Sequence, residues 1–170
     1  MRCAILVRSC ALPIALAATV FCADADHWGP AVDGVRLGIR VTSTPEPRLH
    51  VLLKNASSKV QEIPMGFEGE PDPPRNVILT AHDRREHVLQ VFDLIAAKYH
   101  PPSGGPGPAR NLRLAPGAIH DFTYLLSQLI CVLDRTDTSL DKVLKQGYTV
   151  RATFGFRQTA VASPDLPFEK

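Results

Sequence analysis

The fold is decided by Gly147-Tyr148-Thr149-Val150-Arg151-Ala152-Thr153-Phe154-Gly155-Phe156, a segment in which apolar and polar side chains alternate. Its apolar and aromatic side chains share one face of an extended chain, and Arg151 lies on the other face with two threonines. A period of two residues is typical of a β-strand that buries one face. Because one strand cannot bury its face alone, the rest of the chain must supply an opposing sheet. The segment therefore predicts a mainly β protein built as a β-sandwich.

The preceding chain contains further segments with the same alternation. They predict strands at 35–42, 48–54, 59–65, 77–81, 87–92 and 119–125. The apolar run at 126–133 suits a strand or a helix equally. One short helix is predicted at 138–146, before the last strand, because Thr138 and Asp141 form a capping-box pattern and Gly147 suits the helix end. Proline and glycine predict loops at 66–75 and 101–108.

The first residues have the pattern of a secretory signal peptide. Two arginines precede an apolar run at 11–21, which is shorter than the roughly 20 residues needed to span a bilayer. Ala23-Asp24-Ala25 matches the small-x-small pattern before a cleavage site, so we expect the mature chain to begin at Asp26. Lipid attachment at Cys22 is a weaker alternative because a large aromatic residue precedes it.

These observations predict the organisation of the chain. We expect a signal peptide at 1–25, one domain at 26–157 and a C-terminal tail at 158–170. The protein is then secreted or periplasmic, with no transmembrane segment after cleavage. The formal charge of +2 gives no reason to expect a nucleic-acid partner.

One cysteine is expected to stay in the mature chain. Three of the four lie in the signal peptide, which leaves Cys131 without an internal partner. It sits in the apolar run Leu129-Ile130-Cys131-Val132-Leu133, so we expect a small buried hydrophobic side chain rather than a reactive thiol.

Two short motifs resemble those of immunoglobulin-like (Ig-like) and fibronectin-type-III-like domains. The segment Leu144-Lys145-Gln146-Gly147-Tyr148-Thr149-Val150-Arg151-Ala152 resembles the entry to their penultimate strand, where the tyrosine hydroxyl bonds back to the preceding connection. Leu114-Ala115-Pro116-Gly117 is similar to a turn in secreted bacterial members. The resemblance covers about 35–156 and implies an Ig-like β-sandwich, but it implies no catalytic residue. Two features depart from it: the paired cysteines of antibody domains are absent, and Trp28 precedes the first predicted strand.

The histidines are candidate metal ligands. His27 would bind Cu(II) through the terminal amine and its imidazole only if cleavage followed Asp26, and otherwise it is a flexible N-terminal residue. His82 and His87 flank a predicted hairpin turn and would hold zinc or copper if a third ligand such as His120 came near. The alternative is a charged, solvated hairpin tip.

Charged loops are the other candidate sites. Glu68, Glu70 and Asp72 alternate in a loop that contains no EF-hand spacing, so calcium binding and an ordinary acidic loop are both open. Arg84 and Arg85 occupy the predicted hairpin tip. We expect these five residues to contact a partner because sandwiches usually place recognition on loops.

No catalytic motif is present: Gly-x-Ser-x-Gly, a glycine-rich phosphate loop and His-Glu-x-x-His do not occur. A carboxylate pair for glycoside hydrolysis is set by distance in space, so sequence does not test it. Asn55-Ala56-Ser57 is predicted as a turn, although it also reads as a glycosylation sequon. We therefore expect a secreted, non-catalytic Ig-like module, without a cofactor, that binds a protein or a cell-surface polysaccharide. The alternatives are a small copper- or zinc-binding β-sandwich and an enzyme without a recognisable motif.

Overall fold

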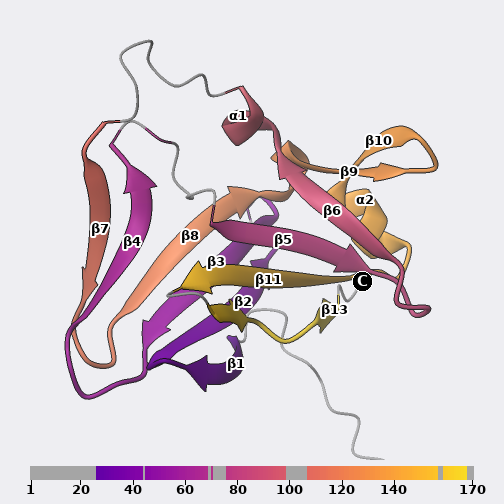
Figure 1. The fold of residues 1–170 in the computed structure, drawn as a ribbon. Coiled ribbons are helices and arrows are strands. Elements are labelled where there is room, and N and C mark those ends of the chain that lie inside the picture. Colours follow the sequence, from indigo (N-terminus) through magenta and orange to yellow (C-terminus); the bar gives the residue numbers. More distant parts are fainter. Residues whose placement is uncertain are drawn as a thin grey trace, which may run out of the picture.

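The structure is a computed structural model that describes residues 26–43, 45–68, 70, 76–98, 107–156 and 159–167. The predicted signal peptide, Asp72 and most of the predicted loop at 101–108 lie outside these residues. The chain is mainly β, and its strands pair antiparallel in sheets whose arrangement is consistent with a β-sandwich (Figure 1).

Two sheets form the layers. The first sheet has the strand order β1-β2-β3-β8, and the second has the order β10-β9-β6-β5-β11-β12, with β13 also paired to β11. The strands of the first sheet are β1 (His27–Val32), β2 (Val35–Thr42), β3 (Arg48–Asn55) and β8 (Ile119–Leu125). Those of the second are β5 (Val77–His82), β6 (Val88–Asp93), β9 (Leu129–Leu133), β10 (Thr136–Ser139), β11 (Thr149–Phe156), β12 (Thr159–Ala162) and β13 (Leu166–Pro167).

In the described ranges, a separate ribbon and three short helical segments accompany the two sheets. The ribbon pairs β4 (Gln61–Phe67) with β7 (Ala109–Leu114). The helical segments are α1 (Leu94–Ala97), the 3₁₀ turn η1 (Leu126–Gln128) and α2 (Leu140–Lys145).

The interior lies between the two sheets. Along β11 the predicted alternation is confirmed, because Val150, Ala152 and Phe154 have no exposed surface. The inward-facing side chains of β2 and β3 are also buried, and Phe122 on β8 packs between the layers. The free energy of folding comes mainly from this apolar burial, because the described chain holds no disulfide. Cys131 is buried as predicted.

The two sheets meet along both sides. On one side the chain leaves β8, turns through η1 and enters β9, so one continuous segment joins the layers. On the other side β1 packs against β12. The backbones approach so closely there that a side chain at Gly29 would collide with Ala162.

Several elements differ from the predictions. Trp28 lies within β1, a strand that was not predicted because Trp28-Gly29-Pro30 has the composition of a turn. The predicted capping box is wrong: Thr138 belongs to β10, the N-cap is Ser139, and the helix begins at Leu140. Gly147 does follow the helix, with a φ of 93° that favours glycine.

The C-terminal prediction also needs correction. Part of the expected tail at 158–170 forms β12 and β13, which both pair with β11, so β11 is not the last strand. The ambiguous run at 126–133 forms the η1 turn followed by β9. The helix α1 was not predicted at all.

Candidate functional site

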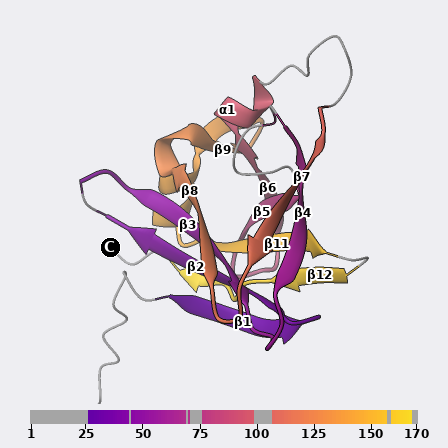
Figure 2. The same cartoon turned by 90° about the vertical axis from the view of Figure 1, so that its left-hand side faces the viewer.

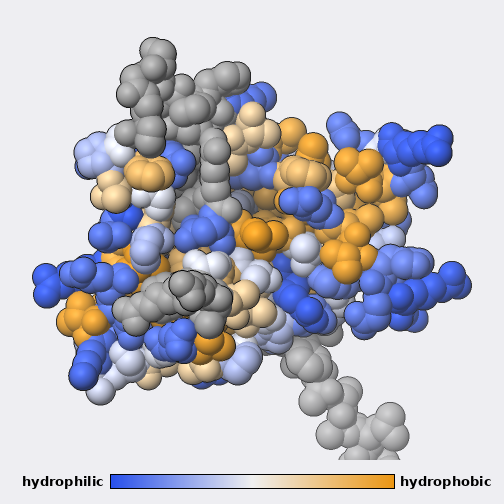
Figure 3. All heavy atoms as spheres, viewed as in Figure 1, coloured by the Kyte–Doolittle hydropathy of each residue, from blue (hydrophilic) through white to orange (hydrophobic). Residues whose placement is uncertain are grey.

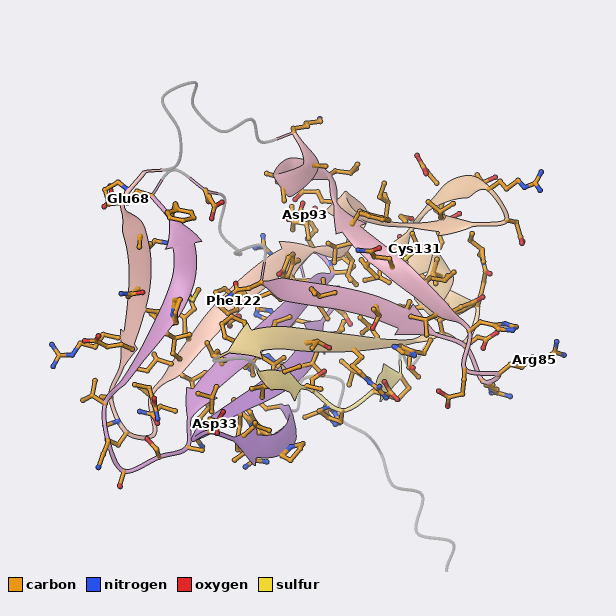
Figure 4. All side chains as sticks on the ribbon, viewed as in Figure 1. Asp33, Glu68, Arg85, Asp93, Phe122 and Cys131 are labelled. Atoms are coloured by element: carbon orange, nitrogen blue, oxygen red, sulfur yellow. The ribbon has the colours of Figure 1, made fainter. Side chains whose placement is uncertain are left out.

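The predicted binding loops do not form one cluster. Glu68 is exposed beside β7, where its backbone N–H donates to the Pro108 carbonyl oxygen at 2.9 Å. Glu70 turns back onto its own loop, because its carboxylate accepts from the Phe67 N–H at 3.0 Å. Arg85 lies at the opposite end of the molecule from Glu68 (Figure 4). A single partner surface therefore does not combine the acidic loop with the arginine turn.

The β5–β6 turn is held by the hydrogen bonds of the Asp83 carboxylate. This carboxylate accepts from the backbone N–H groups of Arg85 at 2.7 Å and His87 at 2.9 Å, and it pairs with the His87 imidazole at 3.0 Å. The hydrogen bond from the His87 backbone is the largest cause of a lowered pKa at Asp83. Arg84 and Arg85 are exposed at the tip.

The four candidate metal ligands lie in separate surroundings. His82 Nε2 lies 2.8 Å from Thr80 Oγ1, whereas His87 pairs with Asp83. His27 begins β1, and His120 on β8 meets the Phe122 ring edge-on with a centroid separation of 4.6 Å. Within the described ranges, no three His, Cys, Asp or Glu side chains come together as a metal site. Metal binding therefore stays a prediction without geometric support.

A hydrogen-bonded network centred on His50 was missed by sequence reasoning. His50 Nδ1 lies 3.0 Å from Asp121 Oδ2, and Nε2 lies 3.1 Å from Thr42 Oγ1. Because a carboxylate only accepts, Nδ1 is the donor. Arg40 joins the same network, 3.5 Å from the Asp121 carboxylate. The residues come from β2, β3 and β8, and only the register across those strands brings them together.

The Thr42 hydroxyl, the His50 imidazole and the Asp121 carboxylate follow one another as do the nucleophile, the general base and the orienting carboxylate of a catalytic triad. The same contacts also connect three neighbouring strands, because Thr42 lies on β2, His50 on β3 and Asp121 on β8. We therefore interpret the His50 network as a structural tie between strands.

The outer face of the second sheet carries a row of apolar side chains. Phe92 on β6 lies opposite Ile130 on β9, and continuing the β5–β6 register by one residue places Ile78 on the other side of Phe92. Phe92 is 42% exposed and Ile78 is 49% exposed. The row thus crosses three neighbouring strands, with Ile78 and Phe92 exposed and Ile130 half-buried.

More apolar surface adjoins this row. Val132 on β9 is 50% exposed, Val88 on β6 is also exposed, and Leu94 and Ile95 extend the surface onto α1. Figure 3 shows hydrophobic residues gathered over the part of the molecule that contains β6 and β9. We call the surface formed by these residues, together with Phe92, Ile130 and Ile78, the apolar face. Apolar surfaces that gather on one face commonly mark interaction sites.

Two of the cavities formed by the described residues lie against the strands of the sheets. One, of about 230 Å³, opens beside α1 and is lined both by inward-facing residues such as Val77, Leu79 and Tyr124 and by Ile78 and Phe92 of the apolar face. The other, of about 120 Å³, lies between the ribbon and β8. Both are smaller than the pockets of about 300 Å³ or more that usually take drug-sized ligands.

Comparisons with known proteins do not assign the chain to a family. No protein-family model matches the sequence, and a search of curated proteins found no similar sequence. No helix in the described part of the chain combines the length and the apolar character that crossing a membrane requires.

Proposed function

We propose that this protein is a secreted, non-catalytic interaction module of the Ig-like kind, and that it docks through the apolar face of its second sheet. The observation that carries the proposal is the row of Ile130, Phe92 and Ile78 across three strands. An antiparallel sheet usually keeps polar side chains on its wet face, so this row departs from the pattern. The predicted signal peptide and the antiparallel layers support a secreted sandwich.

The chemistry of the face favours a protein partner over a polysaccharide. The exposed side chains are mostly aliphatic, and Phe92 is the aromatic residue among them. The polar neighbours in the middle of the sheet include the uncharged Thr80 and Gln90. Such a surface, apolar at its centre and polar toward its rim, resembles a protein–protein interface.

The partner that the face fits is a second copy of the chain. A row next to the apolar row begins with Asp137 on β10 opposite Val132, continues through Gln90 and Thr80, and ends with Arg151 on β11; Val132 and Gln90 are placed opposite each other by continuing the β6–β9 register by one residue. A two-fold axis lying in the interface, parallel to the strands, would place the β10 side of one copy over the β11 side of the other. Asp137 of each copy would then face the partner's Arg151.

The donors at Arg151 allow this pairing. Its Nε and Nη2 atoms each donate to Asp165 at 2.8 Å, which leaves the N–H groups of Nη1 for another acceptor. Asp137 is exposed and supplies a carboxylate. The contacts would be isologous, as in most homodimers.

The test is sedimentation velocity of the wild type over a wide range of protein concentrations. We expect a monomer–dimer equilibrium that Phe92→Asp weakens by at least about tenfold, because the introduced charge would be buried at the centre of the interface. Ile119→Asp is the matched control: Ile119 is 48% exposed but lies on the first sheet, so this variant should dimerise like the wild type.

A second variant tests the orientation of the two copies. Asp137→Arg should weaken the dimer, because it places two cations opposite each other. A wild type that stays monomeric at all concentrations would overturn the proposed partner. Equal loss of dimer in Phe92→Asp and Ile119→Asp would place the interface elsewhere.

A further inference from the structure

Arg110 points toward the interior although it carries a charge. Along β7 the residues Ala109, Asn111 and Arg113 are exposed, whereas Arg110 and Leu112 are half-buried on the opposite face. Figure 2 shows the ribbon of β4 and β7 standing beside β8. The guanidinium is therefore held between the ribbon and the first sheet.

The hydrogen-bonding capacity of Arg110 is largely unused. Its Nε is shielded from solvent and has no hydrogen-bond partner among the described residues, and its Nη2 donates to the Met65 carbonyl oxygen at 3.5 Å. No ion pair involves Arg110 among the described residues. Leaving a shielded donor and a cation unpaired in this way costs free energy.

The side chain lines the cavity of about 120 Å³. Met65 and Leu112 give that cavity an apolar wall, and His120 brings an imidazole from β8. The other lining residue is Asn111, so no carboxylate lines the cavity among the described residues. The described lining thus offers a cation and an imidazole beside apolar surface, and it includes no anion.

We infer that this cavity binds a carboxylate carried by a short apolar group. A guanidinium presents N–H donors in a planar fork that matches the two oxygens of a carboxylate. The His120 ring lines the cavity from the β8 side and would donate from there, and Met65 and Leu112 would pack against the apolar group. One water takes about 30 Å³ of liquid, so the cavity holds a group of several heavy atoms.

This inference is independent of the docking proposal. The cavity lies between the ribbon and the first sheet, whereas the apolar face belongs to the second sheet. Failure of one proposal therefore leaves the other intact.

The experiment is a titration with sodium butanoate, followed by NMR chemical shifts of the amide groups and repeated with butanol and with inorganic phosphate. We expect saturable shifts centred on β7 and β8 with butanoate, and none that saturate with butanol, which has the same chain but no charge. Saturation by phosphate without saturation by butanoate would overturn the assignment to a carboxylate.

Variants at two arginines distinguish binding at this cavity from a general effect of the protein's charge. Arg110→Gln should weaken butanoate binding at least about tenfold, since a charge-assisted pair is worth more than an ordinary hydrogen bond. Arg113→Gln removes an exposed arginine from the same strand and should leave binding unchanged. Arg110→Lys keeps the charge without the fork and should bind with intermediate affinity.

The folded state of each variant is checked by its amide spectrum before titration. Equal affinity in Arg110→Gln and the wild type would overturn the inference. So would equal loss in Arg110→Gln and Arg113→Gln, because it would show a non-specific effect of charge. Should Arg110→Gln fail to fold, Arg110→Lys decides the question, and binding equal to the wild type would then count against the planar fork.

Discussion

The side-chain amide of Asn55 donates to the backbone carbonyl oxygen of Leu114, 59 residues later in the chain, at 2.9 Å. The same amide donates to the Lys59 carbonyl oxygen at 2.7 Å, and its oxygen accepts from the N–H and the hydroxyl of Ser57. Asn55 is fully buried, so one side chain fixes the turn after β3 and connects it to the end of β7. Its amide is also closed to glycosylation in the folded protein, which agrees with the predicted turn.

Replacing Asn55 with alanine should lower the free energy of unfolding by about 2–5 kcal/mol, because it leaves buried carbonyl oxygens without donors. Denaturant unfolding measures the change. Ser58→Ala, at an exposed position of the same turn, should shift the free energy by less than about 0.5 kcal/mol. Similar stability of the two variants would show that the Asn55 bonds are dispensable.

Gly38 makes room for Trp28. A Cβ atom at Gly38 would lie 2.7 Å from the indole, so Gly38→Ala should lower the free energy of unfolding by about 1–3 kcal/mol. Combining it with Trp28→Ala removes the clash. The double-mutant cycle should therefore show that Gly38→Ala costs much less once Trp28 is absent. Additive effects would mean that the ring moves aside freely.

The β5–β6 turn should lose stability in acid. The folded-state pKa of Asp83 is lowered from 3.8, mainly by the His87 backbone hydrogen bond, so the ionised form stabilises the turn. That contribution is complete above the unfolded pKa and is lost as the pH falls through the folded value. The melting temperatures of wild type and Asp83→Asn should therefore converge as the pH falls below 3.8. Glu62→Gln, at an exposed position on β4, is the control and should show no such convergence.

Cys131 should resist alkylation in the folded protein. Burial raises its pKa to about 11, so roughly one thiol in a thousand is ionised at pH 8. Iodoacetamide should label it only after unfolding, as measured by intact mass. Val132→Cys places a thiol at the neighbouring exposed position and should react in the native state. Rapid labelling of native Cys131 would contradict its burial.

The strands with clear alternation were predictable from sequence. Val35–Thr42 and Ile119–Leu125 were predicted with the bounds that the structure has, because one face of each is buried and the other is wet. β1 was missed because Pro30 and Gly29 signal a turn, although an edge strand tolerates proline. β12 and β13 are too short for a periodic signal, and only their pairing with β11 orders them.

The candidate sites were much less predictable. His50 and Asp121 are 71 residues apart in the chain, so only the β3–β8 register shows that they pair. The apolar face likewise depends on which strands are neighbours: Ile78, Phe92 and Ile130 are unremarkable until β5, β6 and β9 are placed side by side. Arg110 is one of two arginines in a strand of alternating exposure, and the sequence alone does not say which of them faces inward.

The close packing of β1 against β12 has a consequence for how the protein can be engineered. Where the first strand of a domain packs against a strand near its C-terminal end, a linker can join the two ends of the domain and new termini can be opened at an exposed turn. The tip at Arg84 and Arg85 offers such a turn. A circularly permuted chain opened there keeps the contact between Gly29 and Ala162. Because the linker brings β1 and β12 close together in the sequence, their packing closes a much shorter loop and costs less conformational entropy.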